Sequence, residues 1–501
     1  MTSVNKYIFE KSEHIYDILS QFFQRNKYIL LITILVGLYI NAIDIFNFKI
    51  NIDAERFMVV PDGNIYKDLH QRYGTYLLLH LFPFLQYHTI SQITGIILLS
   101  LAAIISIDRH NIPHFTKTLY CILLVSFPNF SFLEYFYYQS TYNFIGIFLA
   151  VISYKLLEHS KYIYHYFVPI ILLTLALSSY PACFAVFLTV MVINIILDYK
   201  NNYNYKLAIK HIIIGFIIAI ISYILYYASI NILTTSTLHF QNRYENIKTN
   251  IDIFTRIKQT LITIKDILLS RGFFGSHLFT LPATLLYIIS TILLYKKMDI
   301  KKYIFYILLI CLLFLSVFSI HIMVYYNIPS RGTLALGFLY AFAIVLFLDI
   351  KDIKLHRLIA ILFVFISIIY HANYLTQYNT ATILQYEDDK RIAYDLINRI
   401  NKAAPEIYNK QYYITFVGKL GLTQQQRPFS KKVKDVYGAT IFAWDRGNPY
   451  RQIYLLYLMG LPTNVKLDNS QDSINIANKI PMYPDKDSII VKENHIYVRL
   501  R

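Results

Sequence analysis

Long apolar stretches alternate with short polar segments along the chain up to about residue 375. Roughly 20 apolar residues in a helix cross the hydrocarbon core of a bilayer, so each such stretch predicts a membrane-spanning helix. The pattern predicts an all-α polytopic membrane protein with about eleven transmembrane helices. The predicted spans are 28–46, 90–107, 116–134, 138–157, 164–179, 180–197, 211–231, 276–295, 303–325, 331–349 and 356–375.

Composition and charge agree with this class. Of the 501 residues, 56% are hydrophobic and 15% are charged, with a mean hydropathy of +0.43, whereas soluble domains carry roughly 25% charged residues. The net charge of +17 comes from Lys and Arg in short clusters between apolar stretches. Such clusters orient a membrane protein with its positive loops in the cytoplasm. We attribute the charge to topology and predict the bilayer, rather than nucleic acid, as the partner.

The alternation of these clusters predicts a cytoplasmic N-terminal segment, 1–27, and a membrane domain, 28–375. Two long loops of that domain, 47–75 and 233–275, face the opposite side. The C-terminal region, 376–501, also lies on that side, and its ordinary soluble composition predicts a small α/β domain. The elements expected there are a helix at 384–402, a strand at 411–417, a helix near 449–459 and a strand or hairpin within 488–499.

Two shorter segments have an interfacial character. The segment 76–87 is apolar but too short to span and contains Pro83, which predicts an interfacial or re-entrant helix. Within 233–275, apolar residues recur three and four positions apart beside Arg256 and Lys258. This spacing predicts an amphipathic helix lying on the outer leaflet, with an ordinary surface helix as the equal alternative.

The first predicted span ends in a loop that contains Asp53 and Glu55. Placing an ionisable group beside hydrocarbon costs free energy, so such groups usually have a function. This loop is therefore a candidate site for chemistry at the membrane surface. The two acids are two residues apart and are expected to point in different directions. The alternative is that they only keep a solvated loop off the bilayer.

Cysteine and histidine give no signal for a metal. The three cysteines lie singly within apolar stretches, and His70, His80 and His88 are too far apart to share a helix face with a carboxylate partner. We predict no required metal and no cofactor. The cysteines are Cys121, Cys183 and Cys311.

Three segments together resemble the serotype-converting glucosyltransferases that modify bacterial O-antigen, which are polytopic members of the GT-C superfamily. The first is the Asp-Ala-Glu-Arg-Phe sequence at 53–57, and the second is the Gln-Arg-Tyr-Gly sequence at 71–74. The third is the Pro-Ser-Arg-Gly sequence at 329–332, which opens a late predicted helix. The order of these segments, followed by an outer domain, extends the resemblance loosely over most of the chain.

The resemblance implies a donor such as undecaprenyl-phosphate-glucose and a lipid-linked O-antigen or related lipopolysaccharide glycan as acceptor. Transfer would take place on the periplasmic side of the bacterial inner membrane. It would need a carboxylate to take the proton of the acceptor hydroxyl and cations to hold the departing phosphate. We expect Asp53 to be the base, with Glu55 positioning the acceptor or pairing with Arg56 or Arg72, although the two acids could exchange roles.

Arg72 and Arg331 are the expected phosphate ligands, because a guanidinium matches the geometry of phosphate oxygens. Interfacial snorkelling is the alternative for both. Four further residues are candidates for the pocket or for acceptor recognition, with structural roles as the alternative. They are Glu134, Tyr138, Trp444 and Arg446. Trp444 and Arg446 lie in a segment that ends at Arg451, just before a predicted helix. This segment could instead pack the outer domain onto the membrane domain.

Two other functions remain open at this point. An O-antigen polymerase is also polytopic with outer loops and arginines. A lipid-linked oligosaccharide flippase would carry polar residues inside several spans, whereas here polarity gathers at the outer ends. The sequence does not identify the sugar, the acceptor hydroxyl, the linkage or the oligomeric state.

Overall fold

A computed structural model gives the fold of the chain. Side chains are described from residue 16 onward. The described residues are 3–60, 63, 64, 66, 67, 71–109, 112–134, 136–160, 162–233, 252–269, 280–295, 298–323, 332–349, 354–421 and 440–501.

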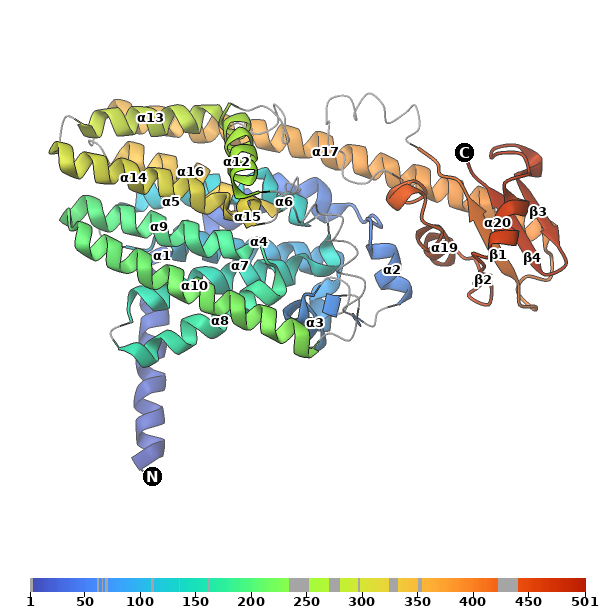
Figure 1. The fold of residues 1–501 in the computed structure, drawn as a ribbon, viewed down its shortest axis with the longest axis horizontal. Helices are drawn as coiled ribbons and strands as arrows, with labels where there is room; N and C mark the ends of the chain where they lie inside the picture. The colour runs from blue at the N-terminus through green and yellow to red at the C-terminus, as the bar shows by residue number, and fades with distance from the viewer. Residues whose placement is uncertain are drawn as a thin grey trace.

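A bundle of roughly parallel and antiparallel helices makes up most of the molecule (Figure 1). The first part of α1 runs across the direction of the other helices and carries the N-terminus away from them (Figure 1). The bundle helices are α1 (Ser3–Phe46), α4 (His88–Ser106), α5 (His114–Val125), α6 (Pro128–Glu134), α7 (Tyr137–Glu158), α8 (Phe167–Ser179), α9 (Cys183–Asn202), α10 (Tyr205–Leu233), α13 (Leu281–Tyr295), α14 (Ile300–Val317), α15 (Ser319–Met323), α16 (Ala335–Leu348) and α17 (Lys354–Ala403).

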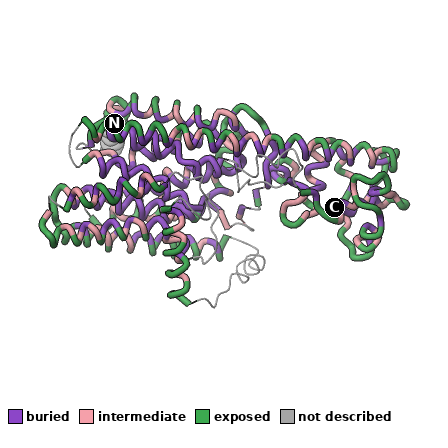
Figure 2. The backbone as a smooth tube through the Cα atoms, turned by 90° about the horizontal axis from the view of Figure 1, so that it is seen from above, coloured by how far each residue is buried: buried purple, intermediate pink, exposed green. Residues whose placement is uncertain are grey.

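Helices that are apolar on every side form the centre of the bundle, since a helix surrounded by other helices has to bury all of its faces. Along α16, residues 335–347 are all buried, and α9 is also almost wholly enclosed. Helices at the periphery, such as α10, have both buried and exposed apolar side chains. Figure 2 shows buried residues gathered inside the bundle and exposed residues along its outer helices. Exposed apolar residues at this density suit contact with lipid.

Each of the eleven predicted spans overlaps helices of the bundle. Nine of them overlap one helix, whereas 116–134 and 303–325 each overlap two. Within the described parts of the chain, seven helices are long and apolar enough to cross a membrane, and four shorter apolar helices occupy the remaining predicted ranges. The fold class of a helical protein with a small C-terminal α/β part is therefore confirmed at this level. The count of eleven crossings and their placement in a bilayer stay predictions.

Two local features differ from a simple series of spans. The predicted span 116–134 is broken into α5 and α6, because Pro128 starts α6 and cannot donate a backbone hydrogen bond to continue α5. In contrast, the predicted helices 356–375 and 384–402 are one continuous helix, α17, of 50 residues. It leaves the bundle and continues into the C-terminal part of the molecule (Figure 1).

Short helices lie between the bundle elements. The predicted amphipathic helix is present as α12, which Asp252 caps by accepting a hydrogen bond from the Thr255 N–H at 2.9 Å. It lies across the direction of the bundle helices (Figure 1). Its exposed apolar residues include Phe254, Ile257 and Leu261, which are three and four positions apart. The short helices are α2 (Ala54–Val59), α3 (Tyr73–Leu81), η2 (Pro83–Gln86), η3 (Ile163–Tyr166) and α12 (Ile253–Leu268).

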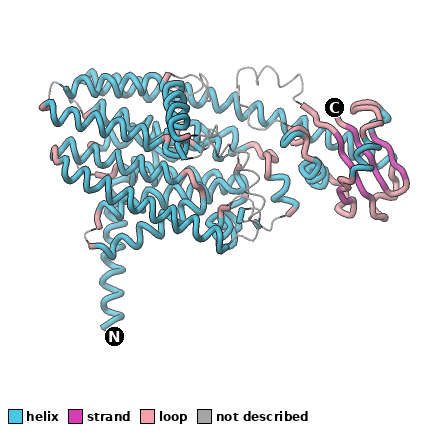
Figure 3. The backbone as a smooth tube through the Cα atoms, viewed as in Figure 1, coloured by secondary structure: helices cyan, strands magenta, loops and turns pink. Residues whose placement is uncertain are grey.

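The described strands all belong to the C-terminal unit, defined here as residues 404–501 (Figure 3). They form one sheet in the order β2-β1-β4-β3, in which β1 is parallel to β2 and β4, and β3 and β4 form an antiparallel hairpin. The predicted strand, helix and hairpin are present, whereas β2 and α20 were not predicted. The elements are β1 (Tyr413–Val417), η6 (Trp444–Arg446), α19 (Pro449–Leu458), β2 (Lys466–Leu467), α20 (Gln471–Ala477), η7 (Lys486–Ser488), β3 (Ile489–Lys492) and β4 (His495–Arg499).

Candidate active site

The two acids that follow α1 lie at the end of the bundle nearest the C-terminal unit (Figure 1). Asp53 precedes α2 and has a left-handed backbone conformation, with φ of 74°, which is costly for a residue with a side chain. Its side chain is 26% exposed, whereas that of Glu55 is fully buried. The left-handed turn brings both carboxylates to one side of the loop, so the expected divergence of the two side chains does not occur.

Arg451 of α19 lies between these carboxylates. Its Nη2 is 2.6 Å from Asp53 Oδ1 and its Nη1 is 2.5 Å from Glu55 Oε1. The third nitrogen, Nε, is 2.8 Å from Oδ2 of Asp445. Glu55 therefore pairs with Arg451, rather than with Arg56 or Arg72 as the sequence suggested.

Tyr138 holds the other oxygen of Asp53. Its hydroxyl donates to Asp53 Oδ2 at 3.1 Å. Its ring stacks on Phe57 with centroids 4.6 Å apart, and Phe57 stacks in turn on Tyr66 at 4.7 Å. This stack fixes α2 against the start of α7, so the carboxylate of Asp53 is constrained from two sides.

Burial and charge act in opposite directions on these groups. Desolvation raises the pKa of Glu55 to about 7, even though Arg451 lowers it. Desolvation alone would lower the pKa of Arg451, but Asp53 and Glu55 raise it above its ordinary value, so the guanidinium stays charged. One oxygen of Glu55, Oε2, has no hydrogen-bond partner among the described residues.

Arg72 is fixed by contacts of its own and lies in a left-handed turn that starts at Gln71, with φ of 53°. Its Nη1 donates to Oε1 of Gln139 at 2.9 Å, and its guanidinium lies 4.7 Å from the ring centroid of Tyr180. Gly74 lets α3 approach α8 closely, because a Cβ there would lie 2.8 Å from the backbone carbon of Ser178. Gln139 follows Tyr138 directly, so Arg72 is tied to the same end of α7 as Asp53.

The segment around Trp444 places its residues differently. Trp444 is half-buried and Arg446 is exposed, whereas Arg451 is the residue that reaches the acids. Asp445 and Arg446 both have positive φ, of 49° and 66°. This strained turn directs the carboxylate of Asp445 to the Nε of Arg451.

Residues 43–348 match the family described as Glucosyl transferase GtrII. The chain belongs to this family. The match confirms the family resemblance drawn from the sequence and includes Asp53, Glu55, Arg72 and Tyr138, whereas Arg451 lies beyond it. No curated protein and no solved structure matches the chain.

Of the other candidate residues in this glucosyltransferase, Arg331 lies outside the described residues. Glu134 ends α6 and is buried, and its Oε2 has no hydrogen-bond partner among the described residues. No contact that we describe brings Glu134, Trp444 or Arg446 to Asp53.

A buried ion pair that the sequence analysis missed lies next to residues 51–57, the segment with Asp53 and Glu55 that we call the acid loop. Lys49 Nζ lies 2.5 Å from Asp44 Oδ1, and both side chains are almost completely buried. Lys49 also donates to Thr382 of α17 at 2.7 Å, and Gln92 of α4 donates to Asp44. The available signal was Asp44 itself, a single acid within an otherwise apolar predicted span.

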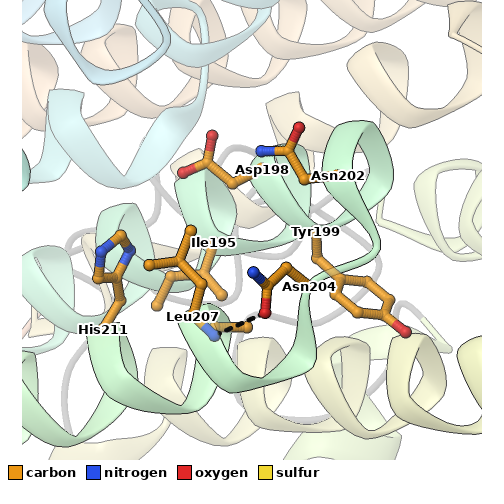
Figure 4. A pocket seen from close by; sticks show the side chains of 8 residues that line it. Ile195, Asp198, Tyr199, Asn202, Asn204, Leu207 and His211 are labelled. Atoms are coloured by element: carbon orange, nitrogen blue, oxygen red, sulfur yellow. Dashed lines mark hydrogen bonds between the residues drawn. The ribbon is translucent and has the colours of Figure 1, made fainter.

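A small pocket with a volume of about 10 Å³ lies at the opposite end of the bundle from the acids, in the turn between α9 and α10. Asp198 and His211 are among its lining residues, and Asn204 Oδ1 accepts the Leu207 N–H there at 3.1 Å (Figure 4). Asp198 also pairs with Arg109. This cavity belongs to an ion-paired end of the bundle and takes no part in the candidate site of the glucosyltransferase.

Proposed function

We propose that this glucosyltransferase moves a hexose, glucose by its family, from a polyprenyl-phosphate donor to a lipid-linked O-antigen or related surface glycan. The observation that carries the proposal is the carboxylate of Asp53. It is partly exposed, and its two oxygens are held by Tyr138 and Arg451. A carboxylate held in this way can accept a proton without first having to be oriented.

The proposed reaction is a single displacement. The acceptor hydroxyl oxygen attacks the anomeric carbon while its proton passes to Asp53, and the bond from that carbon to the phosphate oxygen breaks. The electron pair of the broken bond leaves with the polyprenyl phosphate. Arg72 and Arg331 are the proposed ligands of this phosphate, since its charge grows as the bond breaks.

Glu55 has a different role in this proposal. Its side chain is fully buried and one of its oxygens is bound by Arg451, so it does not reach an acceptor in this conformation. We assign it to holding Arg451. The proposed phosphate ligands are arginines, so the proposed transfer needs no metal and no cofactor.

The reaction is proposed to occur on the periplasmic side of the bacterial inner membrane, with the N-terminus in the cytoplasm. Lys and Arg clusters on alternate polar segments support this orientation. The apolar stripe Phe254, Ile257 and Leu261 supports the placement of α12 on the outer leaflet. Family membership favours transfer over polymerisation or transport.

The donor class is tested by supplying wild-type protein in lipid vesicles with polyprenyl-phosphate glucose or with a nucleotide-linked glucose. Lipid-linked O-antigen serves as acceptor in both reactions. Transfer from the polyprenyl-phosphate donor alone is expected, and a metal chelator should leave the rate unchanged. Transfer from the nucleotide donor alone would overturn the proposed donor.

A further inference from the structure

We propose that the C-terminal unit completes the active site by delivering Arg451 as a positioning residue for Asp53. The inference rests on the proposed function, because it assigns Arg451 to the base of that reaction. Asp53 and Arg451 are 398 residues apart in sequence. Arg451 also lies outside the residues that match the family.

The contact is part of a packed interface. One hydrophobic core includes Ile52 and Phe57 of the acid loop together with Phe442 and Leu456 of the C-terminal unit. The charged groups lie at the edge of this core, and the side chain of Arg451 is 16% exposed. An ion pair anchored by packing on both sides loses less side-chain entropy than a free surface pair.

The position of Arg451 in α19 is unfavourable for the helix itself but suits its contact with the carboxylates. Asn448 caps this helix by accepting the Tyr450 N–H at 3.0 Å, so Arg451 lies in its first turn. A cation there opposes the helix dipole. Asp445 in turn has a left-handed conformation, which is costly for a residue with a side chain. Both costs are offset only where carboxylates gather around the guanidinium.

The three carboxylates also decide which role Arg451 has. Asp53, Glu55 and Asp445 each accept from a different nitrogen of the guanidinium. Their summed charge exceeds that of Arg451 once all are ionised, so the cluster repels rather than attracts a donor phosphate. Arg451 is therefore suited to orient Asp53 and keep it ionised. The phosphate is left to other cations.

The kinetic test compares three variants of the full-length protein in vesicles, with polyprenyl-phosphate glucose as donor. Arg451→Gln is expected to lower kcat by about 10- to 100-fold, because the base loses its fixed geometry, while KM for the donor is unchanged. Arg451→Lys keeps the charge and should recover part of kcat. The matched control is Arg391→Gln. The side chain of Arg391 is 67% exposed and pairs with Asp388 on the same helix, so this variant should behave as wild type.

The pH dependence of kcat separates positioning from general loss of structure. Asp53 is faced by Arg451 of α19, Asp445 of η6, Tyr138 of α7 and Glu55 of α2, with Tyr66 stacked beyond Phe57. Loss of the positive charge of Arg451 makes these carboxylates harder to ionise. The acidic limb of kcat should therefore move to higher pH in Arg451→Gln and return toward wild type in Arg451→Lys.

Three outcomes would overturn the inference. The first is an Arg451→Gln variant whose kcat and acidic limb equal those of Arg391→Gln. The second is an Arg451→Gln variant with a raised KM for the donor and an unchanged kcat, which would make Arg451 a phosphate ligand. If Arg451→Gln does not fold, Asp445→Asn serves in its place, because it removes only the negative charge of the group that accepts from Nε. Wild-type behaviour of both Asp445→Asn and Arg451→Lys would be the third outcome. A wild-type protein that transfers from no polyprenyl-phosphate donor would instead refute the proposed function itself.

Discussion

Glu55 links the candidate site to the stability of the fold. An unfolded glutamate loses its proton near pH 4.5, whereas burial holds the proton of folded Glu55 up to about pH 7. The stabilising contribution of Glu55 is thus complete below pH 4.5 and is lost as pH rises through 7. The side chain in Glu55→Gln stays neutral at every pH. As pH rises from 4.5 to 8, the free energy of unfolding of this variant should therefore increase relative to that of wild type by up to about 3 kcal/mol.

Thermal unfolding in detergent at pH 5 and pH 8 measures this gain. Glu387→Gln is the control, because the Glu387 side chain is 56% exposed and pairs with Lys390 on the same helix. It should show the same pH dependence as wild type. A Glu55→Gln variant with the pH dependence of that control would contradict the buried carboxylate described here.

Single residues of the site were predictable as far as local sequence allows. Asp53 and Arg72 could be singled out, because polar groups beside apolar stretches are a local signal. The convergence of Asp53 and Glu55 on one guanidinium could not be predicted, since it depends on a left-handed turn at a non-glycine residue. Their partner, Arg451, is 396 residues from Glu55 in sequence. A local sequence pattern cannot predict a contact between residues that far apart.

At the scale of elements, the start of α19 controls where Arg451 lies. Asn448 caps this helix through its side chain, and loss of such a cap costs about 1 kcal/mol. Asn448→Ala should lower the melting temperature slightly. It should also lower kcat in the same direction as Arg451→Gln, but by less.

The control for that prediction is Ser470→Ala, which removes the side-chain cap of α20. This helix packs on Tyr497 of β4, on the sheet face opposite to Ile496 and Val498, which belong to the core that includes Ile52 and Phe57. The variant should lose comparable stability with no change in kcat. Equal effects on kcat from both cap substitutions would show that α19 has no special role.

Helices of the bundle were predictable because hydropathy over about 20 residues is a strong local signal. The ends of the helices were less predictable. No local pattern joins 356–375 and 384–402 into α17, which stays helical as it passes from apolar to ordinary composition. The strand β2 has two residues and α20 has seven, which is too short for periodicity to be read. Tertiary packing decides such elements.

On the scale of the whole molecule, the orientation of the chain decides whether the site meets its proposed substrates. A cysteine at Lys492, which is exposed on β3, should react with a membrane-impermeant maleimide added outside intact inner-membrane spheroplasts. A cysteine at Lys206, at the start of α10, should react only after the membrane is permeabilised. The reverse labelling pattern would overturn the proposed topology.

Assembly across distant parts of the chain is the feature that the whole molecule adds. The acid loop follows the first long helix, and α17 brings the C-terminal unit back to it (Figure 1). Lys49, beside the acid loop, donates to Thr382 of α17, so the two parts are tied at a second point. The candidate site is therefore a product of the whole fold rather than of one loop.

Transfer of glucose by Asp53→Asn in lipid vesicles tests the central claim most directly. With polyprenyl-phosphate glucose as donor, this variant should lose at least about 100-fold in kcat, because asparagine cannot accept the acceptor proton. Asp487→Asn, at an exposed position of η7, should retain the wild-type rate. A folded, membrane-inserted Asp53→Asn protein with a rate equal to that of Asp487→Asn would contradict the account.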